Sequence, residues 1–123
     1  MKTKFTDVFV DNIKEVTENN NNYRRVLATT PNMQLVVMSL NPREEIGMEV
    51  HPYHTQFIRV EKGQGVAIID DLAYDIEDDT AIVIPLNTKH NIINTSKTKK
   101  LKLYTLYSPP NHDWNKIEKY KVD

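Results

Sequence analysis

The chain has 123 residues, a mass of 14.3 kDa, a net charge of −1 and a pI near 6.4. This length is typical of one domain with its own hydrophobic core, so we expect a single domain over residues 1–123. Cysteine is absent, which excludes disulfides, thiol nucleophiles and thiolate metal ligands. The near-neutral charge argues against nucleic-acid binding. The sequence shows no signal-peptide pattern and no long apolar run, so we expect a cytoplasmic protein without a membrane segment.

Apolar and polar residues alternate with a period of two along most of the chain, which is typical of half-buried strands. Turn-forming residues stand between these stretches, and Asp70-Asp71 predicts a hairpin turn. Many short strands separated by turns indicate an all-β sandwich or barrel. The predicted strands cover residues 4–10, 23–30, 33–41, 47–51, 55–63, 65–70, 72–76, 80–85, 89–94 and 101–108.

Two polar segments lie outside the predicted strands. The asparagine run at residues 19–22 predicts a loop. A polar tail, residues 111–123, follows the last predicted strand. Within it Trp114, Ile117 and Tyr120 recur every third residue, which favours one short helix lying on the barrel or on a partner.

Several polar side chains gather in the stretch GMEVHPYHTQFIRVEKGQG, residues 47–65. Glu49 and His51 are two residues apart on one predicted strand, so their side chains share a face. Gln56 begins the next strand and has the same parity as Ile58, which places both in the barrel interior. The intervening turn folds the chain back and brings Gln56 towards His51.

A further imidazole, His90, begins the strand predicted at residues 89–94. Polar groups inside a barrel are costly unless they are paired, and a divalent cation can satisfy several of them at once. Two imidazoles and one carboxylate suit first-row transition metals, and an amide oxygen is a weak fourth ligand. The sequence therefore predicts a site for a divalent Mn, Fe, Ni, Cu or Zn ion that leaves positions free for a small molecule. Its predicted ligands are Glu49, His51, Gln56 and His90.

Each of these residues also has a simpler interpretation. Taken alone, Glu49 is typical of a carboxylate on the surface. His51 precedes a proline and is typical of a turn residue. His90 is typical of a histidine buried in the core. His54, which lies in the turn, is an alternative to Gln56 as fourth ligand. The combined spacing over two segments favours the metal site over these separate interpretations.

Residues 47–65 and 79–94 resemble the two sequence motifs of the cupins. In the first motif, Glu49 and His51 stand at the positions of the two histidines, and Gln56 stands at the position of the glutamate. In the second motif the matching residues are Asp79, Pro85, Asn87, His90 and Asn94. Asp79 and Asn87 replace glycines of the motif, and Asp and Asn are the other residues that best tolerate a positive φ.

The resemblance implies the cupin double-stranded β-helix, a jelly-roll barrel, over nearly the whole chain, and it is strongest with small stand-alone cupins similar to mannose-6-phosphate isomerases. It also implies a metal-binding cupin that acts on a small molecule. An isomerase-like reaction on a phosphorylated sugar is the first expectation. A non-haem metal dioxygenase and a non-catalytic metabolite-binding cupin are the alternatives. Small cupins commonly form homodimers, so we expect a homodimer as well.

Overall fold

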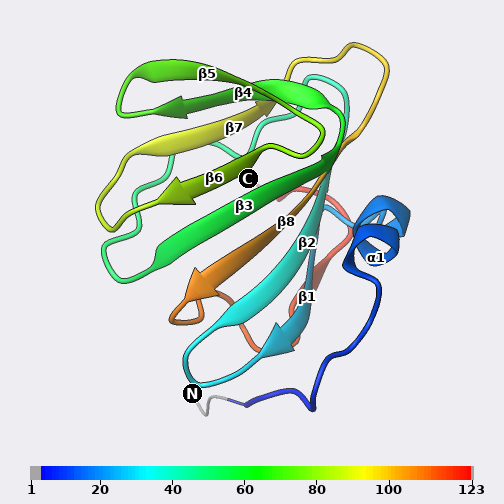
Figure 1. Cartoon of the computed structure of the whole chain (residues 1–123), viewed down its shortest axis with the longest axis vertical. Coiled ribbons are helices and arrows are strands. Elements are labelled where there is room, and N and C mark those ends of the chain that lie inside the picture. Colours follow the sequence, from blue (N-terminus) through cyan, green and yellow to red (C-terminus); the bar gives the residue numbers. More distant parts are fainter. Residues whose placement is uncertain (1–3, 123) are drawn as a thin grey trace.

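The computed structural model describes residues 4–122, and its elements are nearly all strands (Figure 1). These are α1 (Ile13–Asn19), β1 (Arg24–Thr29), β2 (Gln34–Leu40), β3 (Thr55–Lys62), β4 (Gln64–Ile69), β5 (Leu72–Glu77), β6 (Ala81–Ile84), β7 (His90–Asn94), β8 (Leu101–Ser108) and β9 (Ile117–Glu118). Eight of the ten predicted strands overlap a strand of the structure at the expected place; residues 4–10 and 47–51 do not.

The strands form two antiparallel sheets that enclose the core. The larger sheet has the order β6-β3-β8-β2-β1-β9, and the smaller has the order β5-β4-β7. Figure 1 shows the smaller sheet at the top of the view and the larger sheet below it. The all-β cupin fold predicted from the sequence is therefore confirmed. The buried apolar side chains between the sheets include Val36, Met38, Leu40, Ile58, Val60, Ala67, Ile84, Ile92, Leu101 and Leu103.

The period-two pattern correctly predicts which side chains face this core. On β3, Gln56, Ile58 and Val60 are buried, whereas Phe57 and Arg59 between them lie on the outer face and are only partly covered. The inward position of Gln56 is thus as predicted.

Four acidic or amide residues take left-handed backbone conformations at the turns. Asp70 and Asp71 have φ of 48° and 69° between β4 and β5, as a two-residue hairpin turn requires. Asp79 and Asn87 have φ of 69° and 60°. These two residues therefore do what glycine does at the same places in the cupin motifs, as the sequence predicted.

Two predictions about the ends of the chain are wrong. Residues 4–10 form no strand; their only backbone bond to a strand is Thr6 N to Thr29 O at 3.0 Å. Next comes a helix, α1, which was not predicted. Asn12 caps it by accepting a hydrogen bond from Glu15 N at 3.0 Å, and Thr17 is buried where α1 packs against β8, β3 and β2.

The tail forms no helix in the described residues 111–122. Instead, β9 pairs with the edge strand β1, so that Arg24 lies opposite Glu118 and Arg25 opposite Ile117. The spacing of three residues did not mark a helix, because Ile117 and Tyr120 are both exposed and do not form a buried apolar face. Among residues 4–122, no helix is long and apolar enough to cross a membrane.

Candidate metal site

The segment at residues 45–51 runs along β7 and extends the smaller sheet by irregular pairing. Glu49 N donates to His90 O at 2.8 Å, and His90 N donates to Glu49 O at 2.9 Å. Further along, Asn87 N donates to His51 O at 3.0 Å. The segment predicted as a strand is thus a set of single bridges, and these bridges set the positions of Glu49 and His51.

The pairing is interrupted at Gly47, where the side chain of Asn91 takes the place of a backbone partner. Asn91 Oδ1 accepts from Gly47 N at 2.8 Å, and its Nδ2 donates to Glu45 Oε1 at 3.0 Å. Gly47 has φ of 106°, a conformation that favours glycine. Asn91 therefore fixes the path of the chain just before Glu49.

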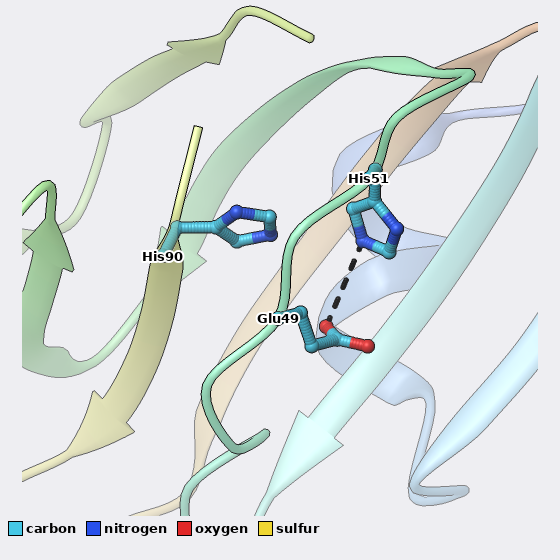
Figure 2. A group of neighbouring side chains, drawn as sticks. All are labelled: Glu49, His51 and His90. Atoms are coloured by element: carbon cyan, nitrogen blue, oxygen red, sulfur yellow. Dashed lines mark ion pairs between the residues drawn. The ribbon is translucent and has the colours of Figure 1, made fainter. Parts of the chain in front are cut away.

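Figure 2 shows the outcome: His90 on β7 points towards the segment that carries Glu49 and His51. One ligand atom of each of these three residues lies within 4.8 Å of the other two. The His51 and His90 rings are 5.1 Å apart, and His51 Nε2 is 3.8 Å from Glu49 Oε1, the dashed contact in Figure 2. Three of the four residues singled out from the sequence therefore meet in one cluster.

The hydrogen bonds of His90 leave its inner nitrogen free. His90 Nδ1 lies 2.8 Å from Thr88 O, and a carbonyl oxygen can only accept, so Nδ1 carries the proton. His90 Nε2 is then an unprotonated lone pair in the neutral ring, and it is buried without a hydrogen-bond partner, as is His51 Nε2. A histidine tied to a carbonyl through one nitrogen and presenting the other to a site is the usual state of a metal ligand.

Burial sets the charge of the cluster. It lowers the pKa of His51 to about 4, and the nearby His90 and His54 act in the same direction. Burial also raises the pKa of Glu49 above its usual value, although His90 and Arg24 oppose the rise. His51 is therefore neutral near pH 7, so its contact with Glu49 is not an ion pair and its nitrogen is available to a cation.

Gln56 and His54, the two alternatives for a fourth ligand, are placed differently. Gln56 is buried on β3, where its Nε2 donates to Thr105 Oγ1 at 3.0 Å while its Oε1 has no partner. His54 lies 5.8 Å from His51 between ring centroids, and its Nδ1 is 2.9 Å from Pro109 O. Gln56 thus offers a free buried oxygen, whereas His54 is tied to the loop after β8.

Sequence reasoning missed two further polar residues near this cluster. Asn91 gave no signal, because its bond to Gly47 depends on a pairing between distant segments. Arg24 did give a signal in the sequence. It has the same parity as Val26, which is buried on β1, and this parity places a charged side chain on the core face.

A two-sheet jelly roll with a half-buried carboxylate and two unpartnered imidazole nitrogens at one strand pair defines a class of small β-proteins with a candidate metal site. Residues 36–107, more than half of the chain, match the cupin domain family, and the chain belongs to the cupins.

Two relatives align with most of the length of this chain. The chain is 46% identical over 114 residues to the uncharacterized protein L612 of Acanthamoeba polyphaga mimivirus, covering 90% of this chain and 71% of the relative. It is 43% identical over 121 residues to the uncharacterized protein YrkC of Bacillus subtilis (strain 168), covering 94% of this chain and 64% of the relative. The chain therefore spans less than two thirds of YrkC. The crystal structure of BH2720 from Bacillus halodurans is 38% identical, with a TM-score of 0.88 over 90% of this chain and 88% of that one.

Proposed function

We propose that this cupin holds one divalent transition-metal ion through Glu49, His51 and His90 and acts on a small organic molecule there. The observation that carries the proposal is a cluster in which one ligand atom each of Glu49, His51 and His90 lies within 4.8 Å of the other two, while Nε2 of both histidines is buried and unpartnered. Buried polar atoms normally have partners, and neither of these two nitrogens has one. A cation satisfies both nitrogens and the carboxylate together.

Gln56 Oε1 is the fourth candidate ligand. The bond from its Nε2 to Thr105 fixes the orientation of the amide and leaves Oε1 free in the interior. An amide oxygen is a weak ligand, so Gln56 contributes less to metal affinity than the histidines. The same oxygen accepts a hydrogen bond from a bound water or from the small molecule.

The first reaction that we propose is isomerase-like proton transfer on a hydroxy-carbonyl compound such as a phosphorylated sugar. When bound, the ion supplies a Lewis acid for oxygen atoms of the compound. His54 is the candidate base, because its Nδ1 faces the Pro109 carbonyl and therefore carries the proton. The other nitrogen of His54 is then the proton acceptor, on a ring 5.8 Å from that of His51.

A dioxygenase is the second candidate, and it is favoured by the ligand set itself, since two histidines and one carboxylate with open positions are typical of non-haem iron oxygenases. The two reactions are distinguished by adding fructose 6-phosphate in deuterated water. Deuterium incorporation that is lost in His54→Ala, with metal retained, supports the isomerase. Oxygen uptake with a substrate and no deuterium exchange supports the oxygenase.

The metal site is tested by titrating chelator-treated protein with Zn²⁺ in a calorimeter. We expect about one equivalent to bind, and we expect His51→Ala and His90→Ala each to abolish stoichiometric binding. Gln56→Ala should weaken binding less. His54→Ala is the matched control, a nearby histidine outside the cluster, and should bind normally. Full binding in both His51→Ala and His90→Ala would show that the ligand assignment is wrong.

A further inference from the structure

A cleft of about 810 Å³ lies at the end of the barrel away from the candidate metal site. It is lined by the end of α1, the turn between β3 and β4, and residues 96–102, which gather on the right of the view in Figure 1. His90 begins β7, and the lining residues of the loop follow its other end. Likewise, Gln56 lies near the start of β3 and Lys62 ends it, about 20 Å further along an extended strand.

Four lysines line this cleft, and two of them donate to the same oxygen atom. Lys102 Nζ donates to Asn21 Oδ1 at 2.9 Å, and Lys100 Nζ donates to the same oxygen at 3.3 Å. Lys102 Nζ also donates to the carbonyl oxygen of Asn20, at the end of α1. These acceptors are all uncharged. Within residues 4–122, neither ammonium group forms an ion pair with a carboxylate.

The two ammonium groups therefore repel each other without an anion to neutralise them. Lys102 is only 8% exposed, so water screens its charge poorly. Burial lowers the pKa of Lys102, and the charge of Lys100 acts in the same direction. An ammonium group has three N–H donors, and Lys102 uses two of them on asparagine oxygens. Donors of both lysines thus remain for a ligand.

The backbone that carries these lysines is held by hydrogen bonds and close packing. Asn94 Nδ2 donates to Lys99 O at 2.9 Å, and Ser96 Oγ accepts from Lys99 N at 3.0 Å. The turn between β3 and β4 lies directly against the start of β8, because a Cβ at Gly63 would be 3.0 Å from Lys100 O. A backbone that is already ordered reduces the entropy lost when a ligand binds.

A purely structural role accounts for only one of the two lysines. A lysine that donates to a carbonyl oxygen at the end of a helix stabilises that helix, and Lys102 does so at α1. Lys100 is exposed and makes no contact with the last carbonyl groups of α1, yet it brings a second positive charge to the same asparagine oxygen. The cap of the helix therefore does not explain the pair.

The other charges of the cleft limit which anions it accepts. The carboxylates of Glu18, Glu77 and Asp78 also line it, so that the lining of four lysines and three carboxylates has a net charge of +1. Such a lining favours a small anion at the lysine pair. A long polyanion such as a nucleic acid would meet the carboxylates as well and be repelled by them.

We propose that this cleft binds a phosphate group through Lys100 and Lys102, at a second site that does not depend on the metal. The oxygens of one phosphate accept hydrogen bonds from several ammonium donors, and its charge neutralises the pair. Lys62 and Lys99 line the same cleft and supply further donors. The volume of the cleft accommodates both free phosphate and a phosphorylated organic molecule, and the experiment distinguishes these two sources.

The test is an NMR titration of isotope-labelled full-length protein with inorganic phosphate at constant ionic strength. We expect saturable shifts of the backbone amides of residues 62–64 and 96–102. Lys100→Gln is the principal variant, because Lys100 is exposed and its replacement should leave the fold intact. Lys97→Gln is the matched control, since it removes one charge from the same exposed loop but Lys97 does not line the cleft.

We expect Lys100→Gln to weaken phosphate binding at least about tenfold. Lys97→Gln should change it by less than about twofold. Lys102→Gln should weaken binding as well, and its thermal unfolding measures separately what Lys102 contributes to α1. Equal affinities in Lys100→Gln and Lys97→Gln would reveal only a general effect of charge and would overturn the inference. The absence of saturable shifts in the unaltered protein would also overturn it.

A parallel titration with glycerol 3-phosphate identifies the source of the phosphate. If it binds more tightly than inorganic phosphate and depends on Lys100 in the same way, the site takes organic phosphates; the reverse order assigns it to the free ion. Chelator-treated protein should bind phosphate with unchanged affinity, so this inference stands even if the proposed metal site fails. Phosphate binding that disappears with the metal would place the anion at the ion and contradict the second site.

Discussion

Glu49 and His90 donate their backbone N–H groups to each other's carbonyl oxygens, at 2.8 and 2.9 Å. In an antiparallel pair, residues linked in this way project their side chains to the same face. This one bridge therefore places a carboxylate from the first cupin motif beside an imidazole from the second. His51 joins them because it is two residues beyond Glu49 on the same segment.

Asn91 is expected to control metal affinity without binding the ion. In Asn91→Ala, Gly47 N loses its acceptor and Glu45 loses its donor, so the segment before Glu49 is less well fixed. Loss of such a supporting contact typically costs about tenfold or more in metal affinity. Calorimetric titration with Zn²⁺ measures the change. Unaltered affinity in a folded Asn91→Ala protein would contradict the positioning role.

Asn94, three residues further along β7, is expected to control stability instead. Its Nδ2 lies within hydrogen-bonding distance of the carbonyl oxygens of Leu40, Asn41 and Lys99, and its Oδ1 accepts from Ser96 N. Asn94→Ala leaves these buried backbone groups unpaired and should reduce the free energy of unfolding by about 2 kcal/mol or more. Urea denaturation is the measurement. Asn91→Ala is the control. A larger loss of stability in Asn91→Ala than in Asn94→Ala would contradict the stabilising role assigned to Asn94.

Two glycines are expected to respond differently to substitution by alanine. A Cβ at Gly65 would lie 2.2 Å from Ile93 O, so the β4–β7 pairing must move apart. A Cβ at Gly47 meets nothing within 4 Å, and the cost there is only the strain of its positive φ, about 1–3 kcal/mol. Thermal unfolding should therefore show a clearly larger decrease in Tm for Gly65→Ala than for Gly47→Ala. The opposite order would be inconsistent with the structure.

The metal-free protein is expected to lose stability in acid because of a buried histidine. Burial, together with Arg24 and Lys116, lowers the pKa of His112 to about 3. The unfolded chain takes up this proton near pH 6.5, well before the folded protein does. The stabilisation from a neutral His112 is therefore complete above about pH 6.5 and is lost as the pH falls towards 3.

His112→Phe tests this dependence, because it retains a ring to pack against Tyr107, whose ring is 5.2 Å away. The free energy of unfolding of the variant, measured by urea denaturation between pH 7 and pH 4, should decrease less than that of the unaltered protein. A residual decrease is expected from His51, whose pKa is also lowered by burial. If the free energy of unfolding decreases with falling pH equally in both proteins, His112 does not contribute to the loss of stability in acid.

The sequence predicted those parts of the fold and site that depend on local pattern. Period-two alternation located the strands and the inward side of Gln56, and the residue types at Asp79 and Asn87 predicted their positive φ. The spacing of Glu49 and His51 correctly placed both side chains on one face, in the cluster with His90.

The features that the sequence did not predict depend on tertiary contacts. The helix α1 is short and packs against β8, β3 and β2 with only Thr17 buried, so no long apolar periodicity marks it in the sequence. The tail pairs with β1 because that edge strand offers free backbone groups, a fact that no spacing within the tail reveals. The contact of Asn91 with Gly47 likewise follows only from the pairing of the two motifs.

Metal content tests the central claim most directly. Elemental mass spectrometry on untagged protein that has never been exposed to a chelator gives both the stoichiometry and the identity of the ion. The geometry of Glu49, His51 and His90 predicts about one equivalent of Mn, Fe, Ni, Cu or Zn per chain. Protein that contains no metal, and takes up none of these ions on titration, would contradict the proposed site.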